Sequence, residues 1–196
     1  MGRVSRAQAQ ENRQRVVATA SRMFREKGTA VSVADLMKAA GLTHGGFYKQ
    51  FASKEDLVEE AIAQAFAEQA AHSAMAFGEH PGEHEAARRT LIEDYLSLWH
   101  RDHPAEGCPV SGFAADLGRE PEQAARAQHV YVNGVRNRAA RLATGDDDGM
   151  AQLCTMVGAL VLARATRGNP ISEELLQAAR TALAEDTRPE PQRHTD

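Results

Sequence analysis

The organisation of this chain is decided by residues 32–51, which read SVADLMKAAGLTHGGFYKQF. Ser32 and Asp35 have the spacing of a capping box, so a short helix is expected to begin at this point. Gly41 ends that helix and starts a three-residue turn, which leads into a second short helix over residues 44–50. Two short helices joined by such a turn are typical of a helix-turn-helix motif.

The second of these helices has features that suit contact with DNA. Gly45 and Gly46 each weaken a helix by up to about 1 kcal/mol, a penalty that close approach to a phosphodiester could offset. Phe47 and Phe51 stand at i and i+4. They are expected to anchor the opposite face of this helix against the helix over residues 11–27. Donor groups gather at its end, on Tyr48, Lys49 and Gln50. The alternative is a small helical bundle of the same shape with no role in DNA binding.

The rest of the chain shows helical spacing of apolar residues and no strand-like alternation of useful length, which predicts an all-α fold. We expect nine helices, over residues 11–27, 32–40, 44–50, 53–76, 85–102, 109–117, 121–143, 150–167 and 172–185. In the fifth of these helices, Leu98 and Trp99 are expected to point inward, and Pro121 suits the first turn of the seventh. The expected domains are a DNA-binding unit over 1–56, a helical body over 57–186 and a disordered tail over 187–196.

Charge is distributed unevenly along the chain. The net charge is −4, yet residues 1–54 carry ten Lys and Arg against three acids, and the remainder carries −11. A basic N-terminal unit on an acidic body is the pattern expected when only that unit meets a polyanion. The alternative is a basic terminus with no partner.

Other classes of protein find little support. The two cysteines are too few for a disulfide scaffold and fit no zinc-site spacing, and neither a signal peptide nor a membrane-spanning stretch is visible. A Gly-rich phosphate loop, a nucleophile elbow and an HExxH motif are all missing from the sequence, so we expect no enzyme, no cofactor and no bound metal. His100, His103 and Cys108 match no standard metal site. The expected compartment is a reducing cytoplasm.

Residues 11–66 resemble the N-terminal domain of the TetR/AcrR family of transcriptional regulators. The matching segments are FREKG (24–28), SVADL (32–36), AAGLT (39–43), GGFYKQF (45–51) and SKEDL (53–57). The family more often has Thr-Leu-Tyr or Ala-Phe-Tyr where this chain has Gly46-Phe47-Tyr48, and His where it has Gln50. These departures concern the choice of operator, not the class of protein. The resemblance implies a homodimeric repressor that binds operator DNA and is released by a small-molecule effector. A helical module that binds no DNA is the alternative.

The resemblance also implies roles for individual residues. Thr43 and Tyr48 resemble residues that contact phosphates, and Ser32 and Lys54 resemble flanking phosphate clamps. Lys49 is a further phosphate candidate. The stretch that reads bases or backs onto the groove holds His44, Gly45 and Phe47. Arg25 and Lys38 are interpreted as solvated surface rather than as DNA contacts.

The C-terminal helices are expected to form the dimer. Residues 150–167 are apolar around much of the helix, which requires burial in a core or in a subunit interface. We favour the interface, because the resemblance implies that the last two long helices pair with their mates in a four-helix bundle. Cys154 lies in the middle of this helix and is interpreted as a structural residue.

The effector pocket is expected among the middle helices, as the resemblance implies. Its candidate lining residues are Tyr95, Trp99, Phe113, Tyr131 and Met156, although for each of them taken alone plain core is the favoured interpretation. Cys108 is a candidate sensor, because an N-cap position before Pro109 and nearby Arg101, His100 or His103 would favour its thiolate. Its segment resembles the branch of the family that includes the repressor of N-ethylmaleimide reductase, which senses electrophiles through cysteine. The alternative is a small buried hydrophobe.

Overall fold

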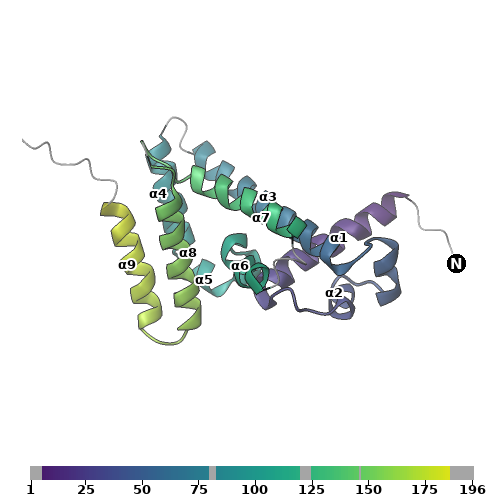
Figure 1. Cartoon of the computed structure of the whole chain (residues 1–196). Coiled ribbons are helices and arrows are strands. Elements are labelled where there is room, and N and C mark those ends of the chain that lie inside the picture. The colour runs from purple at the N-terminus through teal and green to yellow at the C-terminus, as the bar shows by residue number, and fades with distance from the viewer. Residues whose placement is uncertain (1–5, 80–82, 120–124, 146, 186–196) are drawn as a thin grey trace, which may run out of the picture.

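The computed structural model describes residues 6–79, 83–119, 125–145 and 147–185, and within them it has helices and turns but no strand (Figure 1). In chain order, the helices are α1 (Arg6–Lys27), α2 (Val33–Ala39), the 3-10 helix η1 (His44–Lys49), α3 (Lys54–Glu79), α4 (His84–Tyr95), α5 (Leu98–Asp102), the 3-10 helix η2 (Pro104–Glu106), α6 (Pro109–Arg119), α7 (Ala125–Ala140), α8 (Met150–Ala165) and α9 (Ile171–Glu185). The all-α fold expected from the sequence is confirmed.

The helices form an elongated molecule with distinct ends. Figure 1 shows α1 and α2 at the end that carries the N-terminus, and α8 and α9 side by side at the opposite end. The long helices α3 and α7 run between the two ends and pack along each other. We call α1, α2 and η1 together the head, and the helices from α3 onward the body.

The local signals of the helix-turn-helix act as the sequence predicts. The Ser32 hydroxyl oxygen accepts a hydrogen bond from the backbone N–H of Asp35 at 3.1 Å and thereby caps α2. Gly41 has φ of +71°, a left-handed conformation that side chains with a Cβ rarely adopt. Leu36, Met37 and Phe47 are fully buried in the core of the head. The turn therefore orients α2 and η1 through backbone geometry and a shared apolar core.

The core of the head continues into the body. One apolar cluster combines residues of α1, α2 and η1 with Leu57 and Ile62 of α3 and with Phe113 and Leu117 of α6. A second cluster lies among α4, α6, α7, α8 and α9, and Phe66 and Tyr131 pack against both. The head and the body therefore share one packed apolar core.

One predicted helix is interrupted in the structure. Residues 85–102 were expected to be continuous with Leu98 and Trp99 pointing inward, but α4 ends at Tyr95 and α5 begins at Leu98. Ser97 starts the new helix, because its hydroxyl accepts from the backbone N–H of His100 at 3.1 Å and donates to the carbonyl of Asp94 at 2.7 Å. The change of direction leaves Leu98 and Trp99 exposed, so their predicted inward orientation was wrong.

Other boundaries also differ from the expectation. The second helix of the motif is a 3-10 helix, in keeping with the poor helix propensity of Gly45 and Gly46. The first helix begins at Arg6 and the fourth extends to Glu79, both beyond the expected bounds. Pro121 and the tail over 187–196 lie outside the described residues.

Within the part of the chain that the structure describes, no helix is long and apolar enough to span a membrane.

Candidate nucleic-acid interface and ligand cavity

The outer surface of η1 is open to solvent and carries polar groups. Tyr48 is 66% exposed, and Thr43, His44 and Lys49 are exposed beside it. Thr43 occupies the N-cap position of η1, but its side chain makes no capping hydrogen bond. Its hydroxyl and the Tyr48 phenol are therefore available to an external partner such as a phosphate.

Gly45 lies in the same exposed surface. A methyl group built at Gly45 would meet no atom within 4 Å, and the residue does not have positive φ. Neither backbone conformation nor packing within the chain therefore requires glycine at this position. Close approach of an external molecule to the backbone is a physical reason that remains.

Two flanking residues complete the predicted surface. Ser32 is exposed at the start of α2, where its hydroxyl also donates to the carboxylate of Asp35 at 2.6 Å. Lys54 is half-buried in the first turn of α3, next to Ser53, whose hydroxyl accepts from the backbone N–H of Asp56 at 3.1 Å. Both residues begin helices, where unpaired backbone N–H groups favour anions.

Phe47 differs from its neighbours. Its side chain is fully buried, stacks on Phe51 with ring centroids 5.3 Å apart, and meets the Tyr48 ring edge-on at 5.1 Å. The prediction that Phe47 lies in the exposed stretch was wrong, because its place at i−4 to Phe51 turns it toward the core. Phe47 supports the surface from below and leaves His44 and Tyr48 to face outward.

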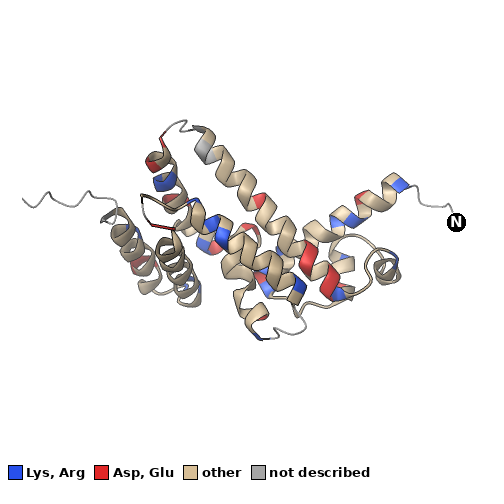
Figure 2. Ribbon diagram, turned by 45° about the horizontal axis from the view of Figure 1, so that its top comes forward, with Lys and Arg blue, Asp and Glu red and all other residues tan. Residues whose placement is uncertain are grey.

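Basic side chains surround this surface. Figure 2 shows Lys and Arg along the N-terminal helix, and the first 54 residues carry a net charge of +7. Arg13 is held by an ion pair with Glu60 of α3 and lies over the Phe51 ring, 4.5 Å from its centroid. The exposed cations Lys38 and Lys49 make no ion pair among those found in the described residues. This end of the molecule therefore has positive charge available to a polyanion.

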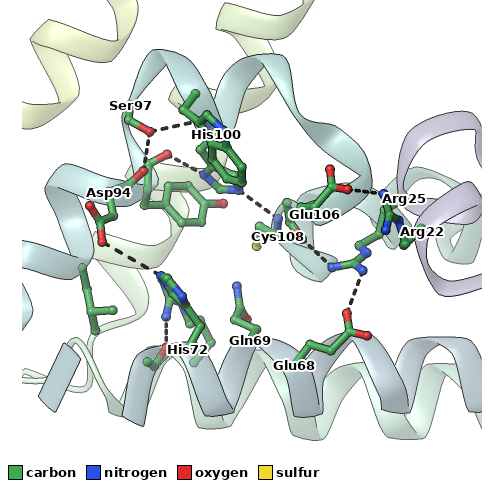
Figure 3. Close-up of a pocket in the computed structure, with 16 residues that line it drawn as sticks. Arg22, Arg25, Glu68, Gln69, His72, Asp94, Ser97, His100, Glu106 and Cys108 are labelled. Atoms are coloured by element: carbon green, nitrogen blue, oxygen red, sulfur yellow. Dashed lines mark hydrogen bonds and ion pairs between the residues drawn. The ribbon is translucent and has the colours of Figure 1, made fainter. Parts of the chain in front are cut away.

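A cavity of about 750 Å³ lies between the head and the body (Figure 3). That volume is in the range of small-molecule sites in proteins. The lining residues are Arg22, Arg25, Glu68, Gln69, His72, Ser73, Leu91, Asp94, Tyr95, Ser97, Trp99, His100, Glu106, Gly107, Cys108 and Arg138. The wall thus combines the end of α1 with α3, α4, α5, α7 and the segment before α6.

The structure brings together only part of the predicted pocket. Tyr95, Trp99 and Cys108 line the cavity, whereas Phe113 and Met156 are fully buried in the apolar cores and Tyr131 packs between them. The Tyr131 hydroxyl donates to the carbonyl of Val110 at 2.8 Å. For these last three residues, the core alternative fits the structure.

Cys108 is held in the wall by His100. Nδ1 of His100 lies 2.6 Å from the carbonyl oxygen of Tyr95, and Nε2 accepts a hydrogen bond from the backbone N–H of Cys108 at 2.9 Å. Burial lowers the pKa of His100 to about 4, so the ring is neutral near pH 7, with its proton on Nδ1. The Cys108 side chain is 1% exposed and stands at the N-cap position of α6, next to the buried Tyr95 ring. Burial and Cys108 raise the pKa of Tyr95.

The segment 97–108 is tied to both ends of the molecule. Arg25 at the end of α1 donates to the carbonyl of Gly107 at 3.0 Å and pairs with Glu68 of α3 at 2.8 Å. Arg164 of α8 donates to the carbonyl of His100 at 2.8 Å. The segment is therefore hydrogen-bonded to the head through Arg25 and to α8 through Arg164. The solvated-surface interpretation of Arg25 was wrong, because the residue is buried in this contact.

Sequence reasoning also missed Arg138. It lies on α7 in line with Tyr131 and Val135, at helical spacing. A cation inside an otherwise apolar stripe was the available signal, because a buried charge usually has a specific purpose.

His100, His103 and Cys108 do not converge as metal ligands. His103 is exposed, stacks on Trp99 at 4.6 Å and directs Nδ1 to the Trp99 carbonyl, whereas His100 uses both ring nitrogens within the chain. Among the described residues, no cluster of three or more His, Cys, Asp or Glu side chains is placed to hold a metal ion.

The head is similar in sequence to known regulators. Residues 16–61 match the family described as bacterial regulatory proteins, tetR family. Over 61 residues the chain is 39% identical to the HTH-type transcriptional regulator AcrR of Shigella flexneri. The aligned residues make up 31% of this chain and 28% of that protein. The chain therefore matches little more than a quarter of the length of this curated relative.

Solved structures are similar over most of the chain. The reduced form of NemR from E. coli superimposes with a TM-score of 0.73 at 17% identity, covering 89% of this chain and 96% of that one. A TetR transcriptional regulator from Chloroflexus aurantiacus superimposes with a TM-score of 0.71 at 24% identity, covering 91% and 95%. At these identities the likeness shows a common fold.

Proposed function

We propose that the chain is a regulator of the TetR/AcrR family, a homodimeric, DNA-binding transcriptional repressor whose affinity for its operator falls when a small molecule binds the cavity. The observation that carries the proposal is the exposed surface of η1, held in place from below by the buried Phe47. The proposal covers no catalytic reaction, and it places the protein with its operator in the cytoplasm.

The proposed DNA contacts follow from exposure and chemistry. Thr43, Tyr48 and Lys49 supply a hydroxyl, a phenol and an ammonium to phosphates, and Ser32 and Lys54 add donors at two helix starts. His44 and Gly45 face the bases or the groove wall. The positive charge of the head supplies the salt-dependent part of the affinity. In domain terms, residues 1–56 form the DNA-binding unit and 57–186 the sensing and dimerising unit.

The proposed dimer interface is the outer face of α8 and α9. One face of α8 is buried in the chain's own core, while Met150, Cys154, Gly158 and Val161, spaced by four, four and three residues, are exposed. Ile171, Ala178 and Ala182 continue an exposed apolar surface on α9. Small residues such as Gly158 allow two helices to approach closely. Cys154, interpreted from the sequence as a structural residue, is exposed on the single chain and lies in this proposed interface.

Ligand binding would act on DNA affinity by linkage. Two heads in a symmetric dimer fit successive major grooves at only one separation. A ligand that prefers a dimer conformation with a different separation of the heads lowers operator affinity. The size of the effect is set by the ratio of the ligand's affinities for the two conformations. The segment 97–108 is the proposed connection, because Arg25 and Arg164 join it to the head and to the dimer helix.

An electrophoretic mobility shift with duplex DNA from the chain's own promoter tests the proposal. Tyr48→Ala is expected to weaken binding about 10-fold or more, because it removes a phosphate contact at the centre of the surface. The matched control is Met75→Ala, which truncates a large apolar side chain of the same exposure (66%) on α3, outside the cavity wall. Equal affinity of the wild type and Tyr48→Ala, or no shift for the wild type on any promoter fragment, would overturn the proposal.

A second proposed activity is covalent sensing of an electrophile by Cys108. The thiol lies on the cavity wall at a helix start, and Arg138 is close enough for Cys108 to raise the pKa of that guanidinium, which burial lowers. In the proposed step, the sulfur adds to the electrophilic carbon of an activated alkene, forming a C–S bond. The thiol proton ends on the adjacent carbon.

Two cysteine variants separate this step from non-specific alkylation. Cys108→Ser is expected to bind the operator normally and to lose its release by N-ethylmaleimide. Cys154→Ser removes the exposed thiol and is expected to keep that response. An unchanged response in Cys108→Ser would eliminate covalent sensing and leave Cys108 as a small buried hydrophobe.

A further inference from the structure

The arginines that line the cavity are paired with carboxylates, with one exception. Two of them have a carboxylate partner within the wall, and both pairs are labelled on the right side of Figure 3. The pairs are Arg22 with Glu106 and Arg25 with Glu68 at 2.8 Å. The imidazole of His72 lies 4.0 Å from the Asp94 carboxylate. Arg138 has no carboxylate partner among the ion pairs found in the described residues.

Arg138 is buried in spite of this. The residue is 6% exposed, and its Nη1 donates to the Ser73 hydroxyl at 2.8 Å. Its Nε is buried and has no hydrogen-bond partner within the described chain. The guanidinium lies 5.7 Å from the centroid of the Tyr95 ring. Burial lowers the pKa of Arg138, but a guanidinium remains protonated in proteins, so the positive charge persists.

A buried charge without a counter-charge is costly, so the arrangement needs an explanation. Packing does not supply one, because an unbranched apolar side chain would fill the same space without the penalty. An anion in the cavity does supply one, because Arg138 lines the cavity and a guanidinium pairs with a carboxylate through charge-assisted hydrogen bonds.

The remainder of the wall indicates the rest of the ligand. Leu91, Tyr95 and Trp99 line the same cavity with apolar and aromatic surface. Trp99 is exposed in the single chain and lies parallel to His103, so one ring face is already covered. The cavity therefore combines one unpaired cation with aromatic surface and has room for a ligand of one or two rings.

We propose that the cavity binds a small aromatic acid whose carboxylate pairs with Arg138 and whose ring lies against Tyr95 and Trp99. The proposal deepens the proposed function and rests on it only in one respect, namely that this acid is the molecule that releases the operator. Binding of the acid itself requires neither DNA nor a dimer.

The test compares acids with their uncharged amides on the full chain without DNA. Calorimetric titration with benzoate, phenylacetate and naphthoate, each against its amide, measures the preference for negative charge. We expect the wild type to bind at least one acid about 10- to 100-fold more tightly than its amide, the range expected for hydrogen bonds to a charged group. Absence of such a preference for every pair overturns the proposal.

Variants of Arg138 identify the group that reads the charge. Arg138→Met keeps the length of the side chain and is expected to remove the preference, while Arg138→Lys keeps the charge and is expected to restore part of it. Arg88→Met is the matched control, because Arg88 is equally buried but pairs with Glu85 and does not line the cavity. An unchanged preference in Arg138→Met, or its loss in Arg88→Met, argues against the site.

The folding of the variants gives an independent readout. Removal of a buried charge that lacks a counter-charge should leave the melting temperature of Arg138→Met unchanged or higher. A large fall would mean that Arg138 serves stability instead, and would overturn the proposal.

A mobility shift with the best acid separates this proposal from the one on which it rests. Release of the operator by the acid and not by the amide supports both. Charge-selective binding in a protein that shifts no DNA upholds the acid site and refutes the DNA-binding function. DNA binding that an acid-saturated protein retains upholds the acid site and refutes its role as effector.

Discussion

The head and the cavity distribute their polar and apolar groups in opposite ways. In the head, Phe47 and Phe51 are buried and the polar groups of Thr43 and Tyr48 are exposed, as in any small stable domain. In the cavity wall, the guanidinium of Arg138 is buried while the ring of Trp99 is exposed. The difference teaches that the apolar side chains of the head stabilise its fold, while the polar groups proposed to contact DNA lie on its surface. In the proposed function, the cavity wall instead holds a buried cation that a ligand would pair.

The most severe test of the comparison is Phe47→Ala. Removal of this ring leaves a cavity in the core of the head and is expected to lower the free energy of unfolding by about 3–5 kcal/mol. Tyr48→Ala, one residue away, is expected to change it by no more than about 0.5 kcal/mol, because the ring is exposed. Urea denaturation of both variants measures the contrast. Similar losses in the two variants would mean that η1 is not divided into a supporting and a displayed face.

The pH dependence of stability tests the buried polar side of the comparison. The pKa of His100 is lowered in the folded protein to about 4 from 6.5, so the unfolded chain binds an extra proton between these values. The stability contributed by neutral His100 is therefore complete above pH 6.5 and falls as the pH drops toward 4, by about 3 kcal/mol.

Urea denaturation at several pH values, compared between wild type and His100→Asn, isolates this contribution. The wild type should lose more stability on acidification than the variant does. His103→Asn is the control, because His103 is exposed and should leave the profile unchanged. Parallel profiles for the wild type and His100→Asn would show that His100 is not buried in its neutral form.

Lys54 tests the electrostatic part of the head. Lys54→Ala is expected to weaken DNA binding and to lower the slope of log K against log salt by about one, the value for a single lost phosphate contact. Fluorescence anisotropy across a salt series measures the slope. Lys27→Ala is the control, because Lys27 ends α1 and lies beside Glu26, so its slope should match the wild type. An unaltered slope in Lys54→Ala would remove Lys54 from the proposed contacts.

Gly45 gives the smallest expected change in stability. Gly45→Ala should leave the free energy of unfolding within about 0.5 kcal/mol of the wild type, because a methyl group there meets no atom within 4 Å. Operator affinity should nevertheless fall if the DNA backbone approaches this position. Gly118→Ala in α6 is the control, since it also adds a methyl group in open space but is not one of the residues of the proposed interface. If Gly45→Ala bound the operator as tightly as the wild type does, close approach of the DNA backbone would not explain the glycine at this position.

The head could be predicted from sequence because its signals are local. Ser32 caps the backbone of Asp35, Gly41 supplies the turn, and Phe47 meets Phe51 one helical turn away. The interruption at Ser97 is also a local feature, but the apolar periodicity across residues 91–99 concealed it. A serine inside a periodic stretch was the signal that could have revealed the new helix start.

The sequence by itself determined the all-α fold, the helix-turn-helix and the basic charge of the head, since caps, turns and periodicity act over a few residues. Only the tertiary structure decided the cavity. Arg138 meets Ser73 across 65 residues of chain, and Arg25 meets Gly107 across 82. Such contacts depend on how α1, α3 and α7 pack against one another, and packing directions are not written in the spacing of any single helix.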